Sequence, residues 1–105
     1  MDTPFIIING EKIEPAAPKM KVWRAFLKSA DKDREHEQLD DFLKEQIDLI
    51  VLAFGKPDVV NEDSIDENME IADVVPMVRT LFKWIQVMTF EKLAKAPNAE
   101  TETAQ

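Results

Sequence analysis

His36 is the single histidine of the chain and the first candidate for acid–base chemistry. A general base needs a neighbour that orients it and a cleft that holds its substrate. His36 instead follows Arg34 and Glu35 and precedes Glu37, so it lies in a strongly polar stretch. The pattern favours a solvated surface histidine over a catalytic base.

Carboxylates are the second candidate, because they could bind a divalent cation. Residues 31–35 (DKDRE) resemble the start of a calcium loop, but the sixth position is His36 instead of glycine and the twelfth is Phe42 instead of an acid. A second group of acids could bind a metal ion weakly, although helix capping and solubility explain why these acids are there without any metal. This group comprises Asp63, Asp66, Glu67 and Glu70. We predict no metal site.

Other catalytic signatures are missing from the sequence. The sequence has no glycine-rich nucleotide-binding motif, no pattern that suggests a Ser-His-Asp catalytic triad and no pair of histidines. It contains neither cysteine nor tyrosine. We therefore expect no enzyme activity and no cofactor. The lack of cysteine also excludes disulfides and thiolate metal sites.

The chain has a negative net charge, and its charged residues are unevenly distributed along the sequence. Thirteen basic and 21 acidic residues give a net charge of −8, which argues against nucleic acid as the main partner. Residues 19–28 carry only basic charges, and residues 58–73 carry only acidic ones. We interpret the two segments as solvated faces that complement each other within the fold. The alternative is an acidic patch that steers a basic partner.

The segment around which the chain is organised runs from residue 71 to residue 90. At about 100° per residue, its apolar positions form one broad stripe on a helix. Asp73 can act as N-cap, and Pro76 is tolerated if it lies in the first turn. We predict a helix over residues 73–90 whose stripe comprises Val74, Val78, Leu81, Ile85 and Met88.

Residues 5–14 predict a β-hairpin. Asn9-Gly10 separates two β-prone runs, and this dipeptide favours a type I′ turn because both central residues need positive φ. A lone hairpin is marginal in water, so it must pack on helices or pair with another chain. Its free edge could bind an extended peptide, self-associate or simply pack.

Three more helices are predicted, over residues 19–30, 35–54 and 63–69. The first has a stripe of Met20, Trp23, Phe26, Leu27 and Ala30. The stripe of the second comprises Leu39, Phe42, Leu43, Ile47, Ile50 and Phe54, and Gly55 ends it with a positive φ. Ser64 with Glu67 fits a capping box at the third, with Asp63 as a competing cap.

These elements predict an α+β protein: an N-terminal hairpin packed on a mainly α domain of three to four helices. Residues 1–90 form one domain, and residues 91–105 form a flexible acidic and polar tail. No stretch approaches the roughly 20 apolar residues of a membrane span, and no targeting segment is evident, so we expect a soluble intracellular protein.

The order of the motifs resembles the tail assembly chaperones of long-tailed bacteriophages, of the type found in phages and prophages of Gram-positive hosts. The resemblance covers residues 5–88 and consists of the hairpin at residues 8–12 (INGEK), the helix end at 51–55 (VLAFG), the acidic turn at 61–65 (NEDSI) and the helix start at 73–81 (DVVPMVRTL).

The resemblance implies a function in virion morphogenesis in the host cytoplasm. Such chaperones bind the helical, aggregation-prone tape measure protein until the tail tube polymerises around it. A longer product made by ribosomal frameshifting would also bind the tail tube protein. Four methionines could provide an adaptable lining for an apolar groove, although ordinary core packing is an alternative. They are Met20, Met69, Met77 and Met88.

Two other functional classes remain open: a small acidic inhibitor or adaptor of phage or mobile-element origin, and a virion structural subunit that polymerises through the hairpin edge as a homo-oligomer. For partner binding we select Trp23, Phe82 and Trp84, because large aromatics dominate interface energetics when they are not core. Trp84 ranks first since it lies at the margin of its stripe. Trp23 has a competing interpretation as core.

Overall fold

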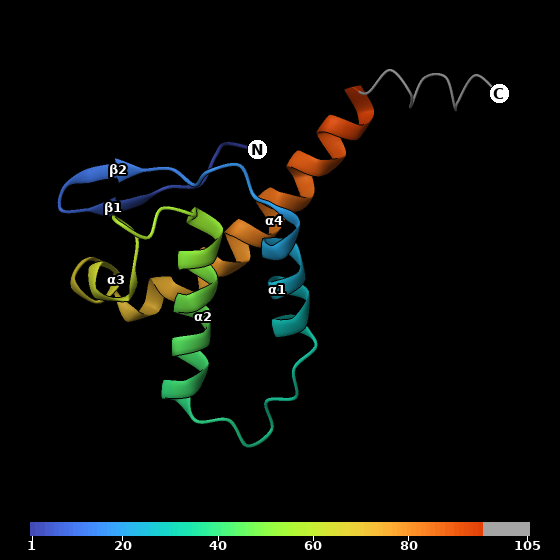
Figure 1. Ribbon diagram of the computed structural model, residues 1–105. Helices are drawn as coiled ribbons and strands as arrows, with labels where there is room; N and C mark the ends of the chain where they lie inside the picture. Colours follow the sequence, from blue (N-terminus) through green and yellow to red (C-terminus); the bar gives the residue numbers. More distant parts are fainter. Residues whose placement is uncertain (96–105) are drawn as a thin grey trace.

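The computed structural model describes residues 1–95, and it confirms the predicted α+β fold (Figure 1). An N-terminal hairpin of β1 (Ile6–Ile8) and β2 (Glu11–Ile13) is followed by four helices. The helices are α1 (Met20–Ala30), α2 (Leu39–Phe54), α3 (Glu62–Asn68) and α4 (Ile71–Lys95). The larger part of the predicted flexible tail, residues 96–105, lies outside the described residues.

The hairpin forms as the Asn-Gly turn requires. Asn9 has a φ of 51° and Gly10 a φ of 81°, and the antiparallel register pairs Ile6 with Ile13. Ile6 and Ile8 point into the core while Ile7 between them is exposed. The backbone N–H of Asn9 donates to the side-chain oxygen of Asn68 at 2.9 Å, so the turn is tied to α3.

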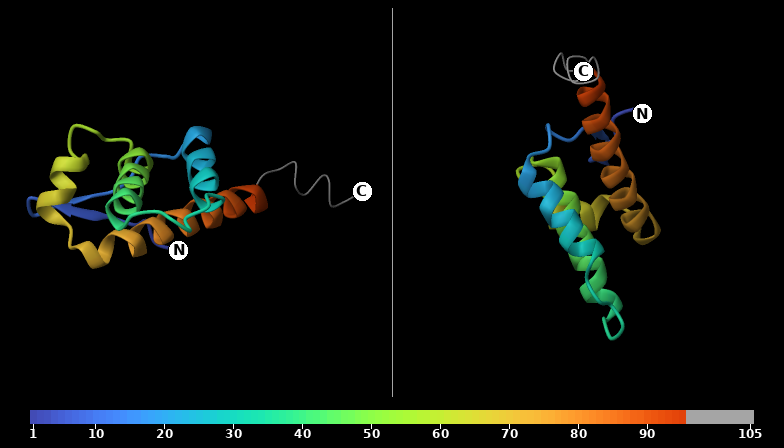
Figure 2. Two further views of the ribbon diagram at one scale, coloured as in Figure 1. Left: turned by 90° about the horizontal axis from the view of Figure 1, so that it is seen from below. Right: turned by 90° about the vertical axis from the view of Figure 1, so that its right-hand side faces the viewer.

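The core lies where α1 and α2, side by side, cross α4 (Figure 2). The predicted stripe of α4 is buried from Val74 to Ile85, and Met88 is half-buried. The largest fully buried side chains come from three helices and the loop after α2: Phe54, Ile50, Ile65, Leu81 and Val60. Gly55 ends α2 with a φ of 62°, as predicted, and its N–H donates to the carbonyl of Val51.

Helix α1 is oriented differently from the prediction. Its buried residues are Val22, Phe26 and Ser29, whereas Met20, Leu27 and Ala30 of the predicted stripe are exposed. The reason is that α1 packs against α2 and α4 together. A polar residue, Ser29, can occupy the buried face because side chains from the neighbouring loop and from α2 satisfy its hydroxyl.

The helix boundaries also differ at several positions. Helix α2 begins at Leu39 rather than residue 35, because residues 31–38 form an ion-paired loop. In α3 the N-cap is Asn61, not Asp63 or Ser64. The side chain of Asn61 accepts from the Ser64 N–H, and the Ser64 hydroxyl accepts from the Asn61 N–H, each at 2.9 Å.

Helix α4 is longer than predicted at both ends. It begins at Ile71, so Asp73 lies in the first turn instead of capping it. Pro76 is therefore inside the helix and removes the bond to the carbonyl of Ala72, an exposed residue whose carbonyl water can satisfy. Residues 91–95, predicted to belong to the tail, are helical because Glu, Lys, Leu and Ala are good helix formers.

Candidate functional site

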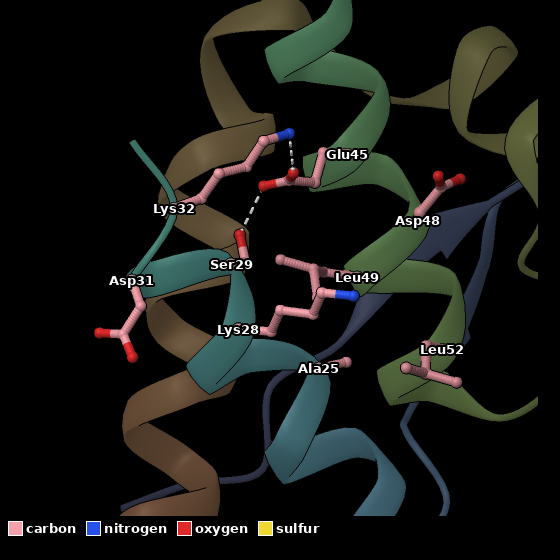
Figure 3. A pocket seen from close by; sticks show the side chains of 9 residues that line it. All are labelled: Ala25, Lys28, Ser29, Asp31, Lys32, Glu45, Asp48, Leu49 and Leu52. Atoms are coloured by element: carbon pink, nitrogen blue, oxygen red, sulfur yellow. Dashed lines mark hydrogen bonds and ion pairs between the residues drawn. The ribbon is translucent and has the colours of Figure 1, made fainter. Parts of the chain in front are cut away.

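Five side chains form a polar cluster at the end of α1, which we call the polar joint: Ser29, Lys32, Arg34, Glu37 and Glu45 (Figure 3 draws three of them). The Ser29 hydroxyl donates to Glu45 at 2.6 Å, and Lys32 donates to the other carboxylate oxygen at 2.8 Å. Arg34 donates to Glu45, to Glu37 and to the backbone carbonyl of Ser29. The polar joint therefore holds the loop between α1 and α2 in place.

The protonation state of Glu45 decides what chemistry the polar joint can do. Partial burial by itself raises the pKa of this carboxyl, but hydrogen bonds from Lys32, Ser29 and Arg34 outweigh it and lower the pKa to about 2. Such a carboxylate is a weak base at neutral pH, and the Ser29 hydroxyl is already bonded to Glu45 and Arg34. The geometry supports a structural role for the polar joint.

A cleft of about 730 Å³ lies beside the polar joint, between α1 and α2 (Figure 3). Lys28 and Asp48 line it together with the apolar side chains of Ala25, Leu49 and Leu52. His36, the predicted surface histidine, is exposed and is not among the residues that line this cleft. The cleft thus presents charges of both signs and no histidine.

The acidic residues 63–70 do not converge on a point. Within residues 1–95, no group of three or more histidine or acidic side chains is arranged to hold a metal ion. Asp63, Asp66 and Glu67 are exposed on α3, while Glu62 forms an ion pair of 3.0 Å with Lys44 of α2. The acids of α3 thus form a solvated surface.

An apolar groove, which we call the α1–α4 groove, opens between the first turns of α1 and the C-terminal half of α4. Its volume is about 550 Å³. Met20 is 59% exposed and Phe90 is 67% exposed, although both are large and apolar. The complete lining comprises Pro18, Lys19, Met20, Trp23, Ile85, Gln86, Met88, Thr89 and Phe90.

Trp23 forms the rigid wall of the α1–α4 groove. It is half-buried, and its ring lies 5.3 Å from that of Phe82 on α4, which in turn stacks on Phe26 at 5.6 Å. Aromatic pairs at these separations attract each other and restrict ring motion. A partner side chain that enters the groove would therefore meet a preorganised surface.

The C-terminal turns of α4 extend beyond α1 and away from the other elements (Figures 1 and 2). They carry Phe90 and Leu93, and Leu93 is 58% exposed. The two residues are three positions apart, so they lie on neighbouring positions of one helix face. This projecting face continues the apolar surface of the α1–α4 groove.

The structure separates the three aromatics predicted for partner binding. Trp23 lines the α1–α4 groove, and Phe82 lies directly behind it. Trp84 is 7% exposed and belongs to the core, so the structure does not support it as a surface contact. It is buried because the apolar surface of α4 is wider than one stripe and is covered on more than one side.

The four methionines considered for a groove divide between two sites. Met20 and Met88 line the α1–α4 groove. Met69 and Met77 instead line a pocket of about 360 Å³ beside the hairpin, near Phe5. Leu93 was missed because the helix was predicted to end at residue 90, and Phe90 was missed because it lies outside the predicted apolar stripe of that helix.

The chain matches no family model, and neither the curated proteins nor the solved structures yield a match. Within residues 1–95, no helix combines the length and the apolar character that crossing a membrane requires. The functional argument therefore depends on the geometry described above and on the resemblance of the motifs.

Proposed function

We propose that this chain is a phage tail assembly chaperone that binds a long amphipathic helix of the tape measure protein and keeps it soluble while the tail tube assembles. The observation that carries the proposal is the α1–α4 groove. It exposes Met20 and Phe90 and is backed by Trp23. Exposed apolar surface of this kind is typical of interaction sites.

The shape of the surface fits a helix better than a small molecule. Met20 and Trp23 are three positions apart on α1, and Phe90 and Leu93 are three positions apart on α4. Helix-in-groove recognition uses apolar anchors spaced in this way. The methionines add adaptability, since their unbranched side chains can follow different partner sequences. This suits a chaperone that must bind along a repetitive helical protein.

Burial of the exposed anchors supplies enough driving force for reversible binding. Full burial of a side chain such as Met or Phe is worth roughly 1.5–3 kcal/mol, and three anchors lie at the groove and on its extension. The three anchors together supply roughly 5–9 kcal/mol, and association costs about 4 kcal/mol or more, so the net affinity from these anchors is weak and the binding is reversible. Reversible binding is required, because tube subunits must displace the chaperone.

Co-expression with the long helical protein encoded next to this gene tests the proposal. We expect a tape measure gene directly downstream, and we expect the wild-type chain to increase the soluble fraction of its product. The variant Met20→Ser/Phe90→Ser should lose this effect while remaining folded, because both side chains are exposed. Leu39→Ser is the matched control, since Leu39 is 67% exposed but lies at the start of α2, outside the groove.

The proposal is overturned if wild type and the groove variant solubilise the partner equally, or if neither co-elutes with any fragment of it. Loss of activity in Leu39→Ser to the same extent would show that general surface polarity, and not the groove, controls solubility.

A further inference from the structure

Two oppositely charged surfaces of the protein do not meet within the fold. Residues 19–28 contain four basic and no acidic residues, and residues 58–73 contain seven acidic and no basic residues. Helix α1 packs against α2 and α4, whereas α3 packs against α2 and β1, so the two segments lie on opposite sides of α2 (Figures 1 and 2). The expectation that they complement each other within the fold is therefore wrong.

The basic surface lies on the solvent side of α1, outside the α1–α4 groove. Lys21, Arg24 and Lys28 are exposed and are three and four positions apart, so they form one stripe about 10 Å long. No carboxylate of residues 1–94 forms an ion pair with them. Leu27 lies beside Arg24 and Lys28 and is 41% exposed. We call these four residues the basic face.

The acidic surface lies where α3 leads into α4. Asp63, Asp66 and Glu67 are exposed on α3, and Glu70 is exposed in the connection that follows. None of these four carboxylates forms an ion pair with a side chain of residues 1–94. Ile71 follows Glu70 directly and is 77% exposed, more than any other large apolar residue that the structure describes. We call these five residues the acidic corner.

Each of the two surfaces places charges of one sign around an exposed aliphatic side chain. Such a surface favours a partner with an apolar centre and charges of the opposite sign, because the apolar side chains are buried while the charges meet. The basic face has three cations beside Leu27, and the acidic corner has four carboxylates beside Ile71. The two surfaces are therefore complementary to each other, and α2 keeps them apart within one copy.

We propose that copies of this chain associate head to tail, with the basic face of one copy on the acidic corner of the next. The contact joins two different surfaces, so a pair of copies keeps one free basic face and one free acidic corner and can accept further copies. No residue that lines the α1–α4 groove belongs to either surface, so the groove stays open. The inference goes beyond the proposed function and does not depend on it.

The contact is weak in dilute solution. Exposed ion pairs each contribute little, and the net charge of −8 makes separate copies repel one another. We expect a dissociation constant on the order of 1 mM. Copies that are bound side by side on one long partner reach an effective concentration of about this size, so the contact would make their binding cooperative.

Amide NMR spectra of the isotope-labelled protein alone test the contact. Between about 0.05 and about 2 mM protein, the amides of residues 20–30 and 62–71 should shift progressively as the bound fraction rises. The amides of the hairpin, residues 6–13, should not shift. Sedimentation velocity over the same range should show an average mass that increases with concentration.

Two variants remove one surface each. Lys21→Gln/Arg24→Gln/Lys28→Gln neutralises the basic face, and Asp63→Asn/Asp66→Asn/Glu67→Gln neutralises most of the acidic corner. Each variant alone should lose the concentration-dependent shifts. The second variant discriminates against simple repulsion, because it reduces the negative net charge and would then associate more readily than wild type. Circular dichroism confirms that each variant remains folded.

A mixture of the two variants tests the head-to-tail geometry. One variant keeps its acidic corner and the other keeps its basic face, so the mixture should form one-to-one pairs that do not grow further. With the label on the acidic-corner variant, only amides of α1 should shift. With the label on the basic-face variant, only amides of residues 62–71 should shift. The matched control Arg79→Gln/Lys83→Gln/Lys92→Gln removes three exposed cations of α4, and it should weaken wild-type association less than about threefold.

Three results would overturn the inference: no concentration-dependent shift up to about 2 mM, a mixture that does not restore the shifts, or shifts that lie in the hairpin or the α1–α4 groove instead. Each of these leaves the proposed function standing, because solubilisation of the partner depends on Met20 and Phe90. Conversely, Met20→Ser/Phe90→Ser keeps both charged surfaces and should still self-associate. The two proposals can therefore fail separately.

Discussion

Substitution of Glu45 by glutamine removes the negative charge to which Lys32, Arg34 and Ser29 all donate. The pKa of the Glu45 carboxyl is about 2 in the folded protein, against an ordinary value of 4.5. At about 1.4 kcal/mol per pKa unit, this difference sets an upper limit of about 3 kcal/mol. The side chain is 23% exposed, so solvent screening reduces the expected contribution to about 1–2 kcal/mol.

The pH dependence follows from the sign of this shift. A carboxyl whose pKa is depressed by folding stabilises the native state above its unfolded pKa, and this stabilisation is lost as pH falls through the folded pKa. The difference in unfolding free energy between wild type and Glu45→Gln should therefore be constant above about pH 5. It should fall by at least half at about pH 3 and nearly vanish at about pH 2.

Urea unfolding followed by tryptophan fluorescence at several pH values measures this difference. Asp48→Asn is the matched control, because Asp48 is an exposed acid one turn further along α2 and forms no ion pair within the described residues. This variant keeps every hydrogen bond of the polar joint, so its unfolding free energy at neutral pH should be within about 0.5 kcal/mol of wild type. Equal stability of wild type and Glu45→Gln at neutral pH, or a difference that persists at about pH 2, would refute the electrostatic account of the polar joint.

Three further substitutions are predicted to change stability, each measured by urea or thermal unfolding. Gly55→Ala should cost about 1 kcal/mol, because φ is 62° there and a Cβ is strained in that conformation. Asn61→Ala should cost about 1 kcal/mol through loss of the α3 cap, whereas Asn61→Asp should retain most of the stability. Trp84→Ala should cost about 3–5 kcal/mol and Phe90→Ala less than about 0.5 kcal/mol, since only Trp84 is buried; equal costs would contradict the assignment of Trp84 to the core.

Local features of the fold were predictable wherever one or two residues determine the backbone. Asn9 and Gly10 require a tight hairpin turn, and Gly55 followed by Pro57 ends a helix, whatever the rest of the chain does. The long apolar stripe of α4 was equally clear, because its period is sustained over several turns. Boundaries were less accurate, since Asn61, Asp63 and Ser64 are all good caps and only their mutual geometry selects one.

The orientation of α1 was not predictable from its own pattern. Met20, Trp23 and Leu27 are as apolar as Val22 and Phe26, so periodicity alone does not say which set faces inward. Packing against α2 and α4 determines which set of residues is buried. The hydrogen bonds of Ser29 to Glu45 and Arg34 allow this polar residue to lie on the buried face. The exposed stripe that results is the basis of the candidate site, which is why that site was only partly foreseen.

The amino-acid sequence by itself determined the hairpin, the four helices, the acidic net charge and the lack of recognisable catalytic motifs, because these depend on residue types and short spacings. Tertiary structure alone decided that Trp84 is core while Met20 and Phe90 remain exposed, and that the cations of α1 find no acid within residues 1–95. The reason is that burial and ion pairing depend on which helix faces meet. A helix with two apolar sides can pack against its neighbours in more than one orientation, and each orientation buries a different set of residues.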